Sequence, residues 1–222
     1  MNREELTQYI DNCILLGNIV TKEDAIYERL DQCSFNAKNI IDSVFIDGFY
    51  VKRDKKDNIH LVYYDGEYEE LDLGDCIDII DDYAFVGRLI HVPGWSAGMY
   101  HPERENLVTV VGKSVKYIGE RAFALSSVTN INFPNVRKIG VCCFEHAKVE
   151  SATFNKLKTV KEAVFSGSEL KSFEGEEVER VRSLAFQNCK NLTFVSIPKA
   201  KTIDHTAFHG CSKLKKENLK IK

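Results

Sequence analysis

This 222-residue sequence has no long apolar run and none of the short motifs that mark the common catalytic folds. A membrane-spanning helix needs about 20 mostly apolar residues, and no run approaches that length, which excludes a transmembrane segment. G-x-S-x-G, phosphate-binding loops, dinucleotide fingerprints and H-E-x-x-H are all missing. The sequence therefore predicts a protein that is not an enzyme and that carries no cofactor.

Paired cysteines and clustered histidines are also missing. The seven cysteines are odd in number and show no C-x-x-C spacing, so we expect reduced, buried thiols instead of a disulfide framework. The six histidines have no carboxylate or cysteine partner at metal-ligand spacing, which predicts no metal site. The N-terminal segment lacks the apolar stretch of a secretory leader, and we therefore expect a cytoplasmic protein.

An internal repeat is the main feature that the sequence does contain. Five phenylalanines, from Phe123 to Phe208, follow one another at intervals of 21 or 22 residues, and Phe85 ends an earlier copy. An aliphatic residue lies five positions before each phenylalanine, and a strand-like stretch begins five or six positions after most of them. A unit this short cannot bury its own apolar face, so the units are expected to stack into a solenoid with ladders of like side chains.

The repeat unit resembles the BspA-like, or treponemal-type, leucine-rich repeat, which reads roughly L-x-x-I-x-I-P-x-x-V-x-x-I-G-x-x-A-F-x-x-C. The best copies are VTNINFPNVRKIGVCCFEHA and LTFVSIPKAKTIDHTAFHGC, and Cys189 and Cys211 fall at the repeat cysteine. The resemblance implies a right-handed leucine-rich-repeat solenoid over residues 64–222, with parallel β-strand ladders and a short helical turn before each phenylalanine. Because packing positions define the family, the resemblance says little about function.

Residues 1–63 do not fit the repeat and predict an N-terminal α+β capping region. One face of a first helix would carry Leu6, Tyr9, Ile10, Cys13 and Leu16. Gly17 would end that helix, and a second helix is expected over residues 21–33. Asp47-Gly48 and Asp65-Gly66 each suit the turn of a β-hairpin.

Residues 88–105 predict a loop inserted into the repeat array. The interval from Phe85 to Phe123 is 38 residues, well beyond one unit. Trp95, Met99 and Tyr100 are residue types common at binding hot spots, and loops that interrupt a repeat array often carry a binding surface. Trp95 could equally fold back over the edge of the first repeat.

The strand segments predict a binding surface, because side chains alternate along a strand and the positions between the core residues must point outward. These positions are Thr109, Val111, Asn130, Asn132, Ser151, Thr153, Ser172, Glu174, Phe194 and Ser196. Such a small, polar and nearly uncharged face can accept another protein with little desolvation cost. We therefore expect a non-enzymatic protein-interaction module that uses this face and the inserted loop.

Charge is divided unevenly along the chain and leaves two alternatives open. Residues 1–106 carry 10 basic against 22 acidic residues, and residues 107–222 carry 20 against 11. An acidic patch could inhibit an intracellular nucleic-acid-processing protein. Its members are Glu67, Glu69, Glu70, Asp72, Asp75, Asp78, Asp81 and Asp82. A basic wall could instead bind nucleic acid directly. Its members are Lys113, Lys116, Arg137, Lys138, Lys156, Lys158, Arg180, Lys199 and Lys201.

Overall fold

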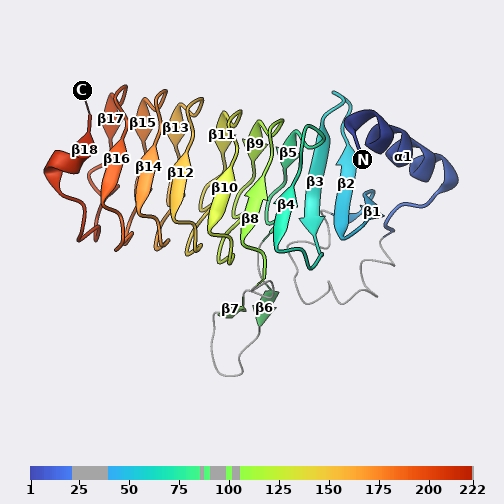
Figure 1. The fold of residues 1–222 in the computed structure, drawn as a ribbon, viewed down its shortest axis with the longest axis horizontal. Helices are drawn as coiled ribbons and strands as arrows, with labels where there is room; N and C mark the ends of the chain where they lie inside the picture. Colours follow the sequence, from blue (N-terminus) through green and yellow to red (C-terminus); the bar gives the residue numbers. More distant parts are fainter. Residues whose placement is uncertain (22–39, 86–87, 91–98, 102–105, 222) are drawn as a thin grey trace.

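The computed structural model describes residues 1–21, 40–85, 88–90, 99–101 and 106–221. Figure 1 shows a stack of coils with the N-terminal helix at one end and the C-terminus at the other. The chain forms a parallel β-solenoid of about seven turns with few helices, which confirms the expected fold class.

Each coil contributes a strand to two sides of the solenoid. The first side is called the strand face, and it consists of β4 (Glu70–Asp72), β8 (Thr109–Val111), β10 (Asn130–Asn132), β12 (Ser151–Thr153), β14 (Ser172–Glu174), β16 (Phe194–Ser196) and β18 (Leu219–Lys220). The second side is called the wall, and it consists of β5 (Ile79–Ile80), β9 (Tyr117–Ile118), β11 (Lys138–Ile139), β13 (Thr159–Val160), β15 (Arg180–Val181) and β17 (Thr202–Ile203). All paired neighbours on both sides run parallel.

A column of phenylalanine rings runs through the core. Consecutive rings from Phe85 to Phe208 are stacked, with centroids 4.6 to 5.4 Å apart and planes within 12° of parallel. The side chains expected at the inner strand positions are in register, as Ala152 with Phe173 and Phe173 with Val195 show. Each interval of about 21 residues in the sequence therefore corresponds to one coil of the solenoid, as the sequence predicts.

The segment before each phenylalanine is not helical, contrary to the expected short helical turn. Two positions before the ring, Arg121, Cys142, Ala163 and Leu184 all have φ between 50° and 57°. A residue in the left-handed conformation cannot continue a right-handed helix. The segment forms a hydrogen-bonded turn instead of a helical turn, for example with a bond from Ala124 N to Arg121 O at 3.1 Å.

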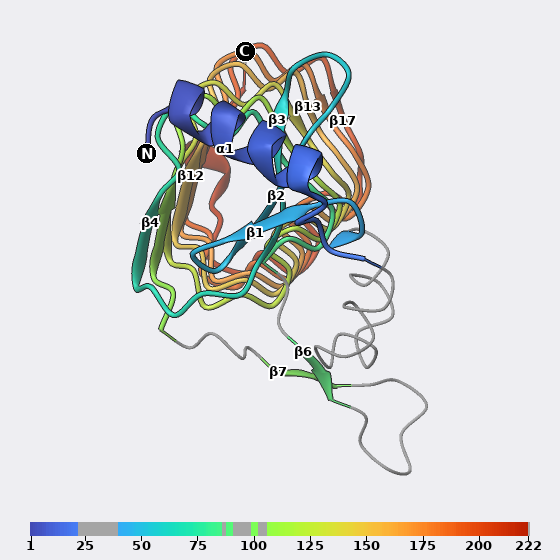
Figure 2. The same ribbon diagram turned by 90° about the vertical axis from the view of Figure 1, so that its right-hand side faces the viewer.

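The N-terminal helix α1 (Arg3–Leu16) covers the first coil, and Figure 2 shows it lying across that end of the stack. A capping box between Asn2 and Glu5 begins the helix, and left-handed Gly17 ends it, as predicted. The buried face is narrower than expected. Leu6, Ile10 and Cys13 are buried, whereas Tyr9 and Leu16 point to solvent. The expected second helix lies mostly outside the described residues.

A meander of three antiparallel strands joins the helix to the coils: β1 (Val44–Ile46), β2 (Phe49–Arg53) and β3 (Ile59–Tyr64). Asp47 and Gly48 both have positive φ, which confirms the first hairpin turn. The second expected hairpin, around Asp65-Gly66, is wrong. β3 pairs with β5 on the wall, while β4 pairs with β8 on the strand face. The apolar and polar residues that alternate after residue 66 thus form the first strand of the strand face, in which buried Leu71 aligns with Val110.

Close approach between coils requires glycine at one wall position. A Cβ atom on Gly140 would lie 2.3 Å from Glu120 N. We expect Gly140→Ala to lower the free energy of unfolding by about 1–3 kcal/mol, because the coils must separate to admit the methyl group. Urea denaturation measures this. Lys161→Ala, at the equivalent position of the next coil, is the control and should change the free energy by less than about 0.5 kcal/mol. An equal loss in both variants would contradict the steric explanation.

Candidate functional site

The strand face brings the predicted binding residues together in two outward columns. One column runs through Thr109, Asn130, Ser151, Ser172 and Phe194. The other runs through Val111, Asn132, Thr153, Glu174 and Ser196. β10 and β12 are neighbours in the stack but belong to different sheets. The side chains of each column therefore still follow one another from coil to coil, although the backbones of β10 and β12 are not paired by hydrogen bonds.

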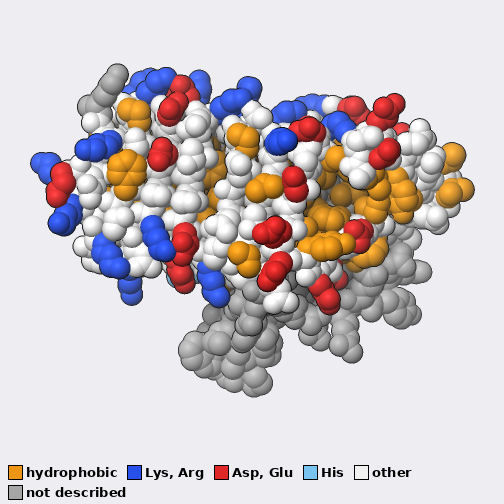
Figure 3. Space-filling view, viewed as in Figure 1, with side chains coloured by type: hydrophobic (Ala, Val, Ile, Leu, Met, Phe, Trp, Pro, Cys, Tyr) orange, Lys and Arg blue, Asp and Glu red, His pale blue; other side chains and the backbone are white. Residues whose placement is uncertain are grey.

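The middle of the strand face is almost free of charge. Among the ten column residues Glu174 alone is ionisable, and the side chains on β10 and β12 are exposed. Figure 3 shows mainly uncharged surface over these strands. Charged residues mark the ends instead, with Glu70 and Asp72 on β4 and Lys220 on β18. Phe194 is half-buried, so it presents part of its ring.

The inserted loop begins as a short antiparallel hairpin, β6 (Arg88–Ile90) with β7 (Met99–His101). Figures 1 and 2 show this hairpin standing away from the coils, below the start of β8. It therefore lies beside the strand face and opposite the wall. Met99 and Tyr100 belong to β7, and Trp95 lies outside the described residues.

The acidic residues do not form the single exposed patch that was expected. Glu70 and Asp72 lie on the strand face, whereas the later carboxylates lie along the wall. Asp78 is only 3% exposed and is not available to a partner. Asp81 is partly buried and binds His60 and Lys52 within the protein. The reason is that β3 pairs with β5, so that Arg3 of α1, Lys52 of β2 and the Ile59 amide of β3 lie against these carboxylates.

Asp78 fastens the N-terminal region to the coils. Its Oδ2 is 2.7 Å from Arg3 on α1 and accepts a 3.1 Å hydrogen bond from Ile59 N, and its Oδ1 accepts from Lys116 Nζ at 2.9 Å. Burial alone would raise the pKa of Asp78, but the hydrogen bonds from Lys116, Ile59 and Arg3 outweigh burial and lower the pKa. Asp78 is therefore a structural carboxylate.

His60 forms a second internal contact next to Asp78. Its Nδ1 lies 2.6 Å from Asp81 Oδ1, and Lys52 approaches the other oxygen of Asp81 at 3.3 Å. Burial by itself would lower the pKa of His60, but the contact with Asp81 more than offsets it and raises the pKa. The histidine thus holds β3 to β5 and shows none of the geometry of a catalytic base that faces a cavity.

The basic wall is partly neutralised within the protein. Lys116 pairs with Asp78, Lys199 with Glu177, and Lys201 with Glu179. Arg137, Lys138 and Lys158 in the middle of the wall have no carboxylate within 4 Å among the residues that the structure describes. Lys161 and Arg182 add to this uncompensated charge, and sequence reasoning missed them. Both lie four positions before the repeat phenylalanine, at the place that Gly119 and Gly140 occupy in earlier coils.

The profile of the BspA-type leucine-rich repeat region matches residues 104–215 in six copies. The chain belongs to the BspA-type leucine-rich repeat family. Its fold is similar to that of a leucine-rich cell surface protein from Faecalibacterium prausnitzii, with 20% identity and a TM-score of 0.50 over 85% of this chain and 44% of that protein. A leucine-rich repeat protein of T. pallidum aligns at 16% identity and a TM-score of 0.46, over 79% of this chain and 92% of that one. No curated protein matches the sequence significantly.

This BspA-type chain thus spans less than half the length of the F. prausnitzii protein. The family match confirms the solenoid that the repeat predicted. The match starts at residue 104, and the coil that contains β4 and β5 lies before it and joins the stack by its strand pairing with β8 and β9. Among the described residues, no helix has both the length and the apolar content to cross a membrane.

The cysteines at the BspA-type repeat position act as packing groups. Each thiol donates a hydrogen bond to the repeat phenylalanine of the coil before its own. Cys189 Sγ donates to Phe165 O and Cys211 Sγ donates to Phe186 O, both at 2.9 Å. A hydrogen bond with Cys211 and burial together raise the pKa of Cys189, whereas the hydrogen bond with Cys189 lowers the pKa of Cys211. Burial also raises the pKa of Cys143, which lies outside the repeat position. A raised pKa keeps Cys189 and Cys143 as thiols, which are poor nucleophiles. No cluster of three metal-binding side chains occurs in the described part of the chain.

Proposed function

We propose that this chain is a non-enzymatic module that binds another protein through its strand face, with the inserted loop at the edge of the contact. One observation carries the proposal, namely the two columns of mostly small and mostly uncharged outward side chains that run along the coils. Solenoids of stacked repeats typically use such an extended surface for binding.

The chemistry of the strand face suits a protein partner. Few ions must be stripped of water when the middle of the face is covered, and charge depletion is typical of the centre of protein interfaces. Short hydroxyl and amide side chains lose little conformational entropy on contact, and they can still donate and accept hydrogen bonds. Phe194 at one end offers the aromatic surface that a hot spot needs.

We further propose that the module works in a reducing compartment. The six cysteines that the structure describes are free, including the pair of neighbours Cys142 and Cys143. Free thiols of this number are typical of proteins kept under reducing conditions.

A photo-crosslinking residue at Ser151 is expected to capture one partner from the lysate of the native host. Ser151 is exposed in the middle of β12, so a bound protein would lie within reach of the probe. Adding Phe194→Asp should lower the yield of the adduct by at least about tenfold, because a charge would be buried at the interface. Gel electrophoresis and mass spectrometry of the adduct measure this.

The matched control places the same photo-crosslinking residue at His146, which is exposed in the turn after Phe144 and lies outside the strand face. It should give no adduct of the same mass. Equal capture from His146, or capture from Ser151 that survives Phe194→Asp in a folded protein, would refute the proposed surface.

A further inference from the structure

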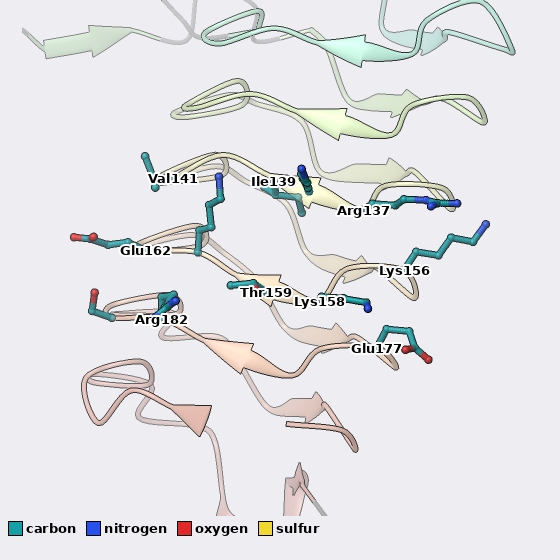
Figure 4. A pocket seen from close by; sticks show the side chains of 12 residues that line it. Arg137, Ile139, Val141, Lys156, Lys158, Thr159, Glu162, Glu177 and Arg182 are labelled. Atoms are coloured by element: carbon teal, nitrogen blue, oxygen red, sulfur yellow. The ribbon is translucent and has the colours of Figure 1, made fainter. Parts of the chain in front are cut away.

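An open groove of about 1000 Å³ lies on the wall, where β11 faces β13. Figure 4 shows Arg137, Lys156 and Lys158 at one end of the groove and Glu162 and Arg182 at the other. Ile139 and Thr159 lie between the two ends. The groove thus has charged side chains at both ends, and it lies on a different side from the strand face.

The lining of the groove is strongly positive. Six cations and two carboxylates line it: Arg137, Lys138, Lys156, Lys158, Lys161, Arg182, Glu162 and Glu177. Glu177 is already paired with Lys199, and Lys156 binds the amide oxygen of Asn135 at 2.5 Å. Of the described residues, no carboxylate lies within 4 Å of the other five cations. Their charge is available to an anionic ligand.

The backbone ladder of the wall is interrupted at this groove. Elsewhere the residue after each wall strand donates to the coil before it, as from Gly140 N to Ile118 O at 2.8 Å and from Arg182 N to Val160 O at 2.9 Å. The corresponding bond from Lys161 N to Ile139 O is absent, and β11 and β13 belong to different sheets. The described strands therefore leave two free edges that face each other across the groove.

The interruption does not extend into the core. Phe144 and Phe165 remain stacked, with centroids 5.2 Å apart, and Phe144 N still donates to Val164 O at 2.8 Å. The interruption of the wall occurs at Lys161, which occupies the repeat position where Gly119 and Gly140 allow neighbouring coils to approach closely. Both strand ladders are thus interrupted between these two coils, β10 from β12 and β11 from β13, whereas the phenylalanine column is continuous.

We propose that this groove binds an extended acidic segment of a partner protein. The backbone of that segment would pair with the free amides and carbonyls of β11 and β13, as in strand addition to a sheet edge. Its carboxylates would face the five available cations, and its apolar side chains would contact the half-buried Val141. This function goes beyond the strand face and does not depend on it.

The composition of the groove favours a peptide over a nucleic acid. No aromatic side chain among the described residues lines the groove, and single-stranded nucleic acids are usually held by bases stacked on aromatic rings. A space between two neighbouring coils also suits one extended chain better than a duplex. A phosphate backbone offers no hydrogen-bond donors for the free strand carbonyls, whereas a peptide backbone offers one at every residue other than proline.

The test measures binding of a fluorescent synthetic peptide of alternating glutamate and valine to the full chain by fluorescence anisotropy. Lys158→Glu with Lys161→Glu should weaken binding by at least about tenfold, because two attractive charges become repulsive. Hydrogen exchange read by NMR should show the Lys158 and Lys161 amides protected when the peptide is bound. This protection would report pairing with the backbone and not general attraction between charges.

Lys190→Glu with Lys213→Glu is the control, because it reverses the same charge at two exposed lysines outside the groove. It should change binding by less than about threefold. Phe194→Asp should also leave peptide binding unchanged, which separates this groove from the strand face. If the groove variant loses its fold, Lys158→Gln with Lys161→Gln replaces it and should weaken binding in the same direction.

Three results would overturn the proposal. The first is an equal loss in the groove and control variants, which would indicate attraction to the whole basic half. The second is an oligothymidylate of equal charge that binds more tightly than the peptide, which would indicate a nucleic-acid site. The third is self-association of the chain that the groove variant abolishes while the peptide does not bind, which would indicate a second copy as the occupant.

Discussion

Replacing Phe165 with alanine is expected to lower the free energy of unfolding by about 3–5 kcal/mol, the largest effect of any single substitution considered for this chain. Phe165 is fully buried and touches both neighbours of the ring column, with centroids 5.2 Å from Phe144 and 5.4 Å from Phe186. The ring also meets Phe173 edge-on at 5.6 Å. Alanine would leave a cavity bounded by three rigid rings that cannot collapse into it.

Urea denaturation followed by circular dichroism measures the loss. Phe194→Ala is the matched control, because Phe194 is a half-buried phenylalanine on the strand face, two coils away from Phe165. It should cost about 1 kcal/mol or less. If the two substitutions cost the same, the ring column would not be the main source of stability.

Replacing Asp78 with asparagine is expected to lower the free energy of unfolding by about 2–3 kcal/mol. The change removes a charge that accepts hydrogen bonds from α1, β3 and the residue before β9. Arg3 and Lys116 are 36% and 58% exposed, so water can solvate both after the change, and the loss stays below that of a fully buried ion pair. Asp75→Asn, at an exposed neighbour, is the control and should cost less than about 0.5 kcal/mol.

The pH dependence of stability, compared between the original chain and Asp78→Asn, tests whether the charge of Asp78 causes this loss. The folded state lowers the pKa of Asp78 below its ordinary value of 3.8. Its contribution to stability is therefore present above the pKa of the unfolded chain and is lost as the pH falls through the lower pKa of the folded chain. The difference in unfolding free energy between the original chain and Asp78→Asn should shrink in acid. A difference that stays constant from neutral pH into acid would rule out the charge as its source.

The repeat region was predictable because its period is visible in the sequence. Residues such as Phe123, Phe144 and Phe165 must align if the units stack, and their spacing fixes which strand residues share a column. The outward columns of the strand face follow from that alignment alone, since alternation along a strand decides which side chains point out.

The remaining features depend on contacts between distant segments. Asp78 looks like one more acid in an acidic run, and only the pairing of β3 with β5 explains why it is buried. The groove depends on a missing backbone bond between Lys161 and Ile139, and such a break has no signature of its own in the sequence. Lys161 follows Gly119 and Gly140 at this repeat position, but Arg182 at the same position keeps its bond to Val160 O, so the loss of glycine alone does not predict the break.

The six-stranded sheet that contains β1, β2, β3, β5, β9 and β11 passes from antiparallel to parallel pairing without a break, and the boundary expected at residue 63 falls inside β3. The N-terminal region therefore offers the hydrogen-bonding edge of β3 to the first coil, through β5. Each later coil can be laid on the one before it as it is synthesised, because every coil needs only its immediate predecessor. A fragment that began after β3 would lose that starting template and expose the edge of β5, and it should be prone to aggregate.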